Sequence, residues 1–252
     1  MKLYSPAKDT LNLPVWLNRL ILYTPFFLFA AFTVFLAIPF TRSTALWVLA
    51  ENHPVELATF VFFLWAGVLG LKLAGSIVKG RHHLYASAFY ALFSIALVVI
   101  AMEEVAWGQW VFGFETPDCI NHINAQQETT LHNMGCLQGK SELFRLAFSI
   151  GGLLGVMIHG MPRFNIAGVP PLLFPWFLII TAHALLDVYN DYFPIEKQFD
   201  AYMQRTSELV ELLIAMAVFL YILLNSKRIS PVLGKQGPST GRNETNQTTI
   251  HL

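Results

Sequence analysis

The chain alternates long apolar runs with shorter polar connections. Inside lipid, every backbone N–H and C=O group must be hydrogen-bonded within the protein. A helix satisfies its own groups, whereas strands do so only when they pair into a closed barrel. A helix of about 20 apolar residues crosses about 30 Å of hydrocarbon. The pattern predicts an all-α, polytopic integral membrane protein with about six transmembrane helices in one domain, residues 1–229. The predicted spans are residues 20–39, 55–74, 85–105, 143–160, 170–188 and 208–225.

Composition supports a membrane protein and argues against nucleic-acid binding. Hydrophobic residues make up 55% of the chain and charged residues only 13%, whereas soluble domains carry about 25% charged residues. The formal net charge is +0, and no basic cluster stands out. We therefore expect the lipid bilayer as the surroundings and no nucleic acid as a partner.

Lys and Arg distribute unequally between the connections, and this predicts the orientation. Of the 16 Lys and Arg residues, 11 fall on the side that holds the N-terminus, the second-to-third connection, the fourth-to-fifth connection and the C-terminal tail. Cytoplasmic loops carry the excess of positive charge in membrane proteins. Both termini are therefore predicted to be cytoplasmic. Residues 230–252 are polar and are predicted to form a disordered cytoplasmic tail.

Carboxylates concentrate near the opposite, outer ends of the predicted spans. Ionisable residues inside a membrane cost about 2.5–3.5 kcal/mol each on insertion scales and are functional candidates by default. The alternative is that each lies at a helix end and is wetted by headgroup water. For Glu208 and Glu211, which open the predicted sixth span, the N-terminal end of the helix dipole supplies a further structural explanation. The acids within two turns of the outer boundary are Glu56, Glu103, Glu104, Asp187, Glu208 and Glu211.

His183 and Asp187 lie four residues apart in the predicted fifth span and therefore on one helix face. Asp187 is placed to hold the imidazole in one tautomer, as a general base or a metal ligand requires. The alternative is a His–Asp hydrogen bond that only joins helices.

The connection at residues 106–142 is the longest polar stretch and is expected to be a lid over the carboxylates or a surface for a partner. On a helical turn Glu128 would align with His132, although a solvent-exposed histidine is an equal alternative. Cys119 and Cys136 fall in this stretch, and in an oxidising compartment a disulfide between them is one of two open possibilities.

A Glu-Glu pair at Glu103–Glu104 is followed by Trp107–Gly108–Gln109, a Thr-Pro-acid turn and Leu131–His132–Asn133. This stretch, residues 101–133, resembles an uncharacterised group of bacterial polytopic membrane proteins. The resemblance implies a shared fold and site in a bacterial inner (cytoplasmic) membrane, without an activity. The matching residues are Glu103–Glu104, Trp107–Gly108–Gln109, Thr116–Pro117–Asp118, Asn124, Gln126, Glu128 and Leu131–His132–Asn133.

The order of acids and histidines is also similar to the CAAX-protease and bacteriocin-processing superfamily of intramembrane glutamate proteases. That resemblance implies that Glu103 or Glu104 is a general base which activates water for peptide hydrolysis. His132 and His183 would then stabilise the oxyanion, and Asp187 would match the final Asn/Asp of the family. The chain departs from the family at Gly108, where the family has Arg, and at Glu128, where it has Phe.

Three function classes follow. The first is an intramembrane hydrolase of a membrane-embedded peptide or lipid bond, with catalytic residues Glu103, Glu104, His132, His183 and Asp187. A divalent zinc or iron ion is a variant, with Glu104, His132, His183 and Asp187 as candidate ligands. The second is an accessory subunit that docks in a membrane complex through residues 115–140, and the third is a proton- or cation-coupled transporter. Expected substrate-binding residues are Trp107, Gln109, Asn124, Glu128, Asn133 and Glu211.

Overall fold

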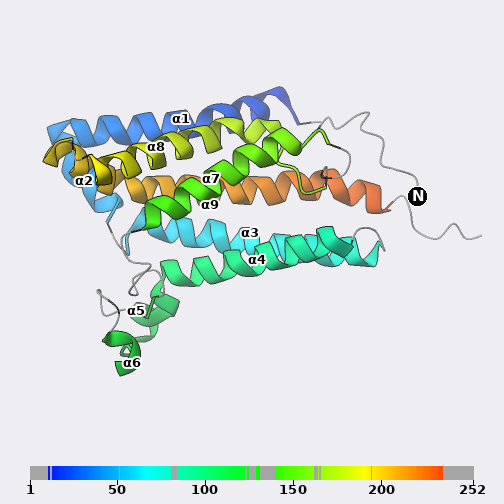
Figure 1. Ribbon diagram of the computed structural model, residues 1–252, viewed down its shortest axis with the longest axis horizontal. Helices are drawn as coiled ribbons and strands as arrows, with labels where there is room; N and C mark the ends of the chain where they lie inside the picture. The colour runs from blue at the N-terminus through cyan, green and yellow to red at the C-terminus, as the bar shows by residue number, and fades with distance from the viewer. Residues whose placement is uncertain are drawn as a thin grey trace, which may run out of the picture.

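The computed structural model is an all-α bundle (Figure 1). Within the part of the chain that it describes, six helices are long and apolar enough to cross a membrane. This confirms the predicted polytopic membrane protein. The described residues are 11, 13–50, 52–80, 84–122, 124, 129–130, 140–161, 164, 166–193 and 195–234.

The first hydrophobic run forms two helices rather than one. Helix α1 covers Val15–Ala37 and helix α2 covers Pro39–Val48. Ile38 between them has an extended backbone, and Pro39 begins α2 at the first helical position, where its missing N–H costs nothing. The sequence interpretation missed α2, a short helix that follows directly after the first span.

Helices α3 (Pro54–Lys79) and α4 (Leu84–Glu104) pack along most of their length as an antiparallel pair. Small residues allow this close approach: a Cβ added at Gly67 would lie 2.6 Å from Val98 Cγ2. Membrane helices commonly use such small residues at their contacts. The pair brings the start of α3 and the end of α4 to the same end of the bundle.

Helix α7 (Ser141–Ile158) packs against α8 (Phe174–Tyr192), which follows the short 3-10 helix η2 (Pro171–Leu173). A glycine again sets the contact, because a Cβ at Gly152 would lie 2.1 Å from the ring of Phe177. The bounds of α7, and of η2 with α8, agree to within a few residues with the predicted fourth and fifth spans, residues 143–160 and 170–188.

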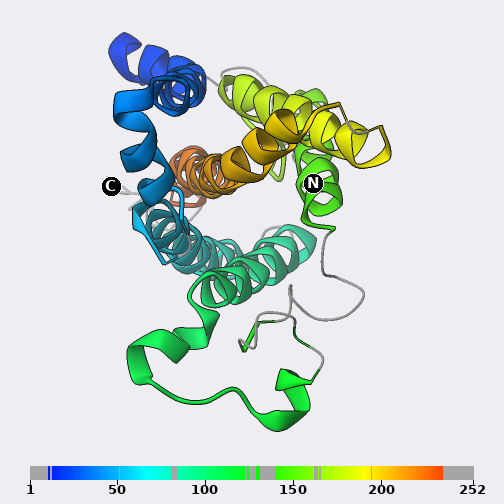
Figure 2. The same cartoon turned by 90° about the vertical axis from the view of Figure 1, so that its left-hand side faces the viewer.

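Helix α9 (Lys197–Gly234) lies at the centre of the bundle, and its neighbours are α3 on one side and α8 on the other (Figure 2). Its middle is buried almost all round, including Leu213, Ile214, Ala215, Ala217 and Val218. The sequence placed the start of this span at residue 208, which is wrong by three turns, because the helix begins at Lys197. At its other end the helix passes residue 230, the predicted start of the tail.

The two ends of the bundle differ in content. Helix α1 begins and α9 finishes at one end, as an even number of crossings requires (Figure 1). The other end carries α2 and three short helices that follow α4. These are η1 (Ala106–Gly108), α5 (Gln109–Phe112) and α6 (Asp118–Asn121). The acids singled out from the sequence lie at this second end.

Candidate functional site

Carboxylates from three helices meet at the end of the bundle that carries α5 and α6. Helix α4 brings Glu104 to this point, and four other glutamates lie close enough to act electrostatically on its carboxylate. We call these five residues the glutamate cluster: Glu56 from α3, Glu103 and Glu104 from α4, and Glu208 and Glu211 from α9. The expectation that acids from separate spans would come together at one level thus holds for α3, α4 and α9.

Glu103 and Glu104 point to different surroundings, as adjacent helical residues do when about 100° separates them. Trp107 Nε1 donates a hydrogen bond to Glu103 Oε1 at 2.6 Å. Trp107 has φ of +55° and Gly108 has φ of +82°. A positive φ is uncommon for a bulky side chain, so the turn after α4 is held in a strained conformation that places the indole beside Glu103.

Other members of the cluster have roles of different kinds. The carboxylate of Glu56, in the first turn of α3, accepts the backbone N–H of Asn52, which lies just before the N-cap residue His53. Glu208 and Glu211 do not open their helix, since α9 begins at Lys197 and carries Asp200 in its first turn. The dipole explanation given for Glu208 and Glu211 is therefore wrong, and both lie inside a continuous helix.

Polar side chains tie the connection after α4 together. Gln109 donates through Nε2 to Thr116 Oγ1 at 2.9 Å, and its Oε1 accepts the backbone N–H of Thr129 at 2.8 Å. Asn124 is buried and donates to the carbonyl oxygen of Thr130 at 2.8 Å. Gln109 and Asn124, expected to bind substrate, therefore hold the connection in place in this structure.

His183 and Asp187 have separate partners rather than each other. Arg145 Nη2 of α7 donates to Asp187 Oδ2 at 2.9 Å, and both side chains are largely buried. His183 Nε2 lies 2.8 Å from Thr206 Oγ1 of α9, and His183 Nδ1 has no hydrogen-bond partner within the described chain. The expected hydrogen bond from His183 to Asp187 is therefore wrong, because the carboxylate turns to Arg145, which the sequence interpretation did not include in the site.

Helix α9 separates these two groups. Thr206, which contacts His183, and Glu208 differ by about 200° around a helix axis, and Thr206 and Glu211 differ by about 140°. The glutamates act on Glu104, whereas the group that acts electrostatically on His183 is Arg145. The site candidates thus form the glutamate cluster on one face of α9 and an Arg145–Asp187–His183 group on another.

No group of three or more His, Cys, Asp or Glu side chains in the described residues is arranged to hold a metal ion. Of the candidate ligands, Glu104 therefore does not share such a group with His183 and Asp187. The positions of Glu128, His132, Asn133 and Cys136 lie outside the described residues, as does the side chain of Cys119. The disulfide and the role of His132 stay predictions.

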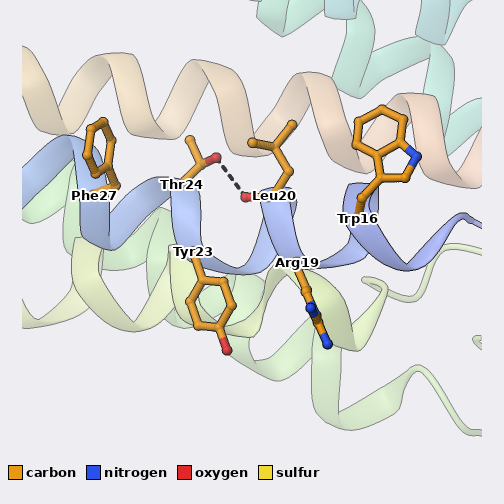
Figure 3. Close-up of a pocket in the computed structure, with 6 residues that line it drawn as sticks. All are labelled: Trp16, Arg19, Leu20, Tyr23, Thr24 and Phe27. Carbon is orange, nitrogen blue, oxygen red and sulfur yellow. Dashed lines mark hydrogen bonds between the residues drawn. The ribbon is translucent and has the colours of Figure 1, made fainter.

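A groove of about 400 Å³ lies along the first half of α1, away from the glutamate end. Its lining comes from α1 alone, with Trp16, Leu20 and Phe27 projecting to one side of the helix and Tyr23 to the other (Figure 3). Trp16 and Phe27 are 66% and 72% exposed. This open, lipid-level surface brings none of the candidate residues together.

Comparison of the chain with protein-family models, with curated proteins and with solved structures gives no match.

Proposed function

We propose that the protein is a membrane-embedded hydrolase in which Glu104 of the glutamate cluster is the general base that activates water. The supporting observation is that four further glutamates, from α3, α4 and α9, act electrostatically on Glu104 at one end of the bundle. Neighbouring carboxylates in unlike surroundings can supply one base and one acid. Glu103 also accepts a hydrogen bond from Trp107.

The substrate class is a peptide or lipid bond within the membrane. The sequence resemblance to glutamate proteases supports a peptide. The site lies at the non-cytoplasmic side if the Lys- and Arg-rich end of the bundle faces the cytoplasm. The proposed location is a bacterial inner membrane, with both termini cytoplasmic.

Oxygen-18 incorporation tests the proposal for any hydrolysable substrate, whether peptide or lipid. The protein in lipid nanodiscs is incubated in H₂¹⁸O with membrane lipid extract and, separately, with a set of synthetic transmembrane peptides. Hydrolysis adds one ¹⁸O to a product carboxyl or phosphate, which mass spectrometry detects. We expect Glu104→Gln to abolish labelling. The control is Asp191→Asn, at an exposed acid near the end of α8, which should leave labelling unchanged.

Both variants must elute as the wild-type protein does on size exclusion before their labelling is compared. Labelling that persists in Glu104→Gln would refute the role of this residue. Absence of labelled product from the wild-type protein with both substrate sets would instead favour a non-catalytic function.

Exposed aromatic side chains favour an accessory subunit as the second candidate. Phe112 of α5 is 79% exposed, and Phe114 just after it is 40% exposed. Such side chains next to a long polar connection suit a partner membrane protein. Replacement of residues 115–140 by a short linker would then remove a stoichiometric partner that copurifies with the wild-type chain.

A further inference from the structure

Two buried side chains, Arg145 of α7 and His183 of α8, have hydrogen-bonding atoms that nothing in the described chain satisfies. Arg145 is 6% exposed and His183 is 3% exposed. The Nε and Nη1 atoms of Arg145 and the Nδ1 atom of His183 have no partner there. Buried polar atoms nearly always have a partner, either protein or ordered water, so these three atoms point to a group that binds between them.

The contacts of Thr206 favour one tautomer of His183. The hydroxyl of Thr206 donates to the carbonyl oxygen of Tyr202 at 2.9 Å. A hydroxyl has one proton, and when that proton goes to this carbonyl or to that of Met203, 3.2 Å away, the oxygen accepts from His183 Nε2 at 2.8 Å. In this arrangement the neutral imidazole is protonated at Nε2, and its Nδ1 holds a bare lone pair that requires a hydrogen-bond donor.

The unmet donors of Arg145 approach the face of α8 that carries His183. Arg145 contacts Asp187, which lies one helical turn, about 6 Å of axial rise, from His183 on the same face of α8. Arg145 also acts electrostatically on His183. A single oxygen that is hydrogen-bonded to Arg145 and to His183 can bridge nitrogen atoms up to about 6 Å apart.

The chemistry of the atoms identifies the group. The guanidinium needs an acceptor, while Nδ1 needs a donor, and a hydroxyl oxygen supplies both. A fully ionised carboxylate or phosphate would satisfy Arg145 and leave Nδ1 unmet, and a metal ion on Nδ1 would be repelled by the guanidinium.

We propose that a hydroxyl group, of water or of a lipid headgroup, binds between Arg145 and His183 and donates its proton to His183 Nδ1. Arg145 holds the oxygen, Asp187 and Ser141 hold Arg145 through its Nη2, and Thr206 fixes the imidazole. This is a second polar site on a different face of α9 from the glutamate cluster, and it does not rest on the hydrolase proposal.

Nuclear magnetic resonance of the full chain in nanodiscs tests the site directly. The protein is labelled with ¹⁵N-histidine, and the His183 signals are assigned by their loss in His183→Gln. We expect His183 to be protonated at Nε2 and bare at Nδ1, with a cross-peak from the ring to a hydroxyl proton. Arg145→Met should abolish this cross-peak, and Arg205→Met, at an exposed position on α9, should leave it at wild-type intensity.

The two sources of the hydroxyl are separated by isotope. Both kinds of hydroxyl proton exchange in D₂O, but only a headgroup hydroxyl adds cross-peaks from carbon-bound protons, and these vanish in perdeuterated lipid. A proton on Nδ1 in the wild-type protein, or no hydroxyl proton near the ring, would overturn the proposal without recourse to any variant of Arg145. A cross-peak of full intensity in folded Arg145→Met would also overturn it.

Discussion

The ion pair between Arg145 and Asp187 gives a quantitative test of the helix arrangement. At 2.9 Å and an effective dielectric constant of about 20, the two charges attract by about 6 kcal/mol. The desolvation of both groups offsets much of this, so the pair contributes little net stability over an apolar replacement. Removal of one partner is different, because it leaves the other charge buried. We expect Asp187→Leu to lower the free energy of unfolding by about 3–5 kcal/mol.

The double variant Arg145→Met with Asp187→Leu should be less destabilised than Asp187→Leu alone by about 2 kcal/mol or more. The measurement is unfolding in mixed detergent micelles by titration with dodecyl sulfate, followed by circular dichroism. Asp191→Leu, an exposed acid one turn further along α8, is the control and should change stability by less than about 0.5 kcal/mol. A double variant whose loss equals the sum of the two single losses would refute the pairing of α7 with α8 through these charges.

Two further predictions concern packing and the connection after α4. Gly152→Ala should destabilise the protein by about 1–3 kcal/mol, since the new Cβ would lie 2.1 Å from the buried ring of Phe177. The neighbouring Gly151→Ala meets no atom within 4 Å and should be neutral or stabilising in the same unfolding assay. Gln109→Leu removes the hydrogen bond to the backbone of Thr129 and should speed proteolysis of the connection without changing global unfolding, whereas equal proteolysis rates would contradict this role.

The spans could be predicted from the sequence because hydrophobic length alone selects them. The start of α9 could not, since residues 197–207 are mostly polar and read as a connection. In the structure Met203 and Thr206 are buried, while Gln204 and Arg205 are exposed. The helix thus continues as an amphipathic segment, a periodicity that a search for uniformly apolar runs does not detect.

The partners of site residues depend on contacts between helices, which spacing along one helix does not reveal. The i, i+4 spacing of His183 and Asp187 predicted a pair, yet Asp187 meets Arg145, 42 residues away in sequence. A signal was present: Arg145 stands inside the predicted fourth span, where a cation is costly and needs a partner. The charge count placed Arg145 with the connection between spans, so the spacing argument paired Asp187 with the nearest histidine instead.

The central position of α9 accounts for why polar residues gather on two of its faces. A helix surrounded by protein can carry glutamates and a threonine at membrane depth, because neighbouring helices rather than lipid receive them. Thr206 meets α8 and Glu211 acts on Glu104 of α4, so the polar residues of α9 lie on two different faces. We expect chemistry at the glutamate cluster not to require His183, and a variant at His183 that eliminated ¹⁸O labelling while leaving the fold intact would refute this separation.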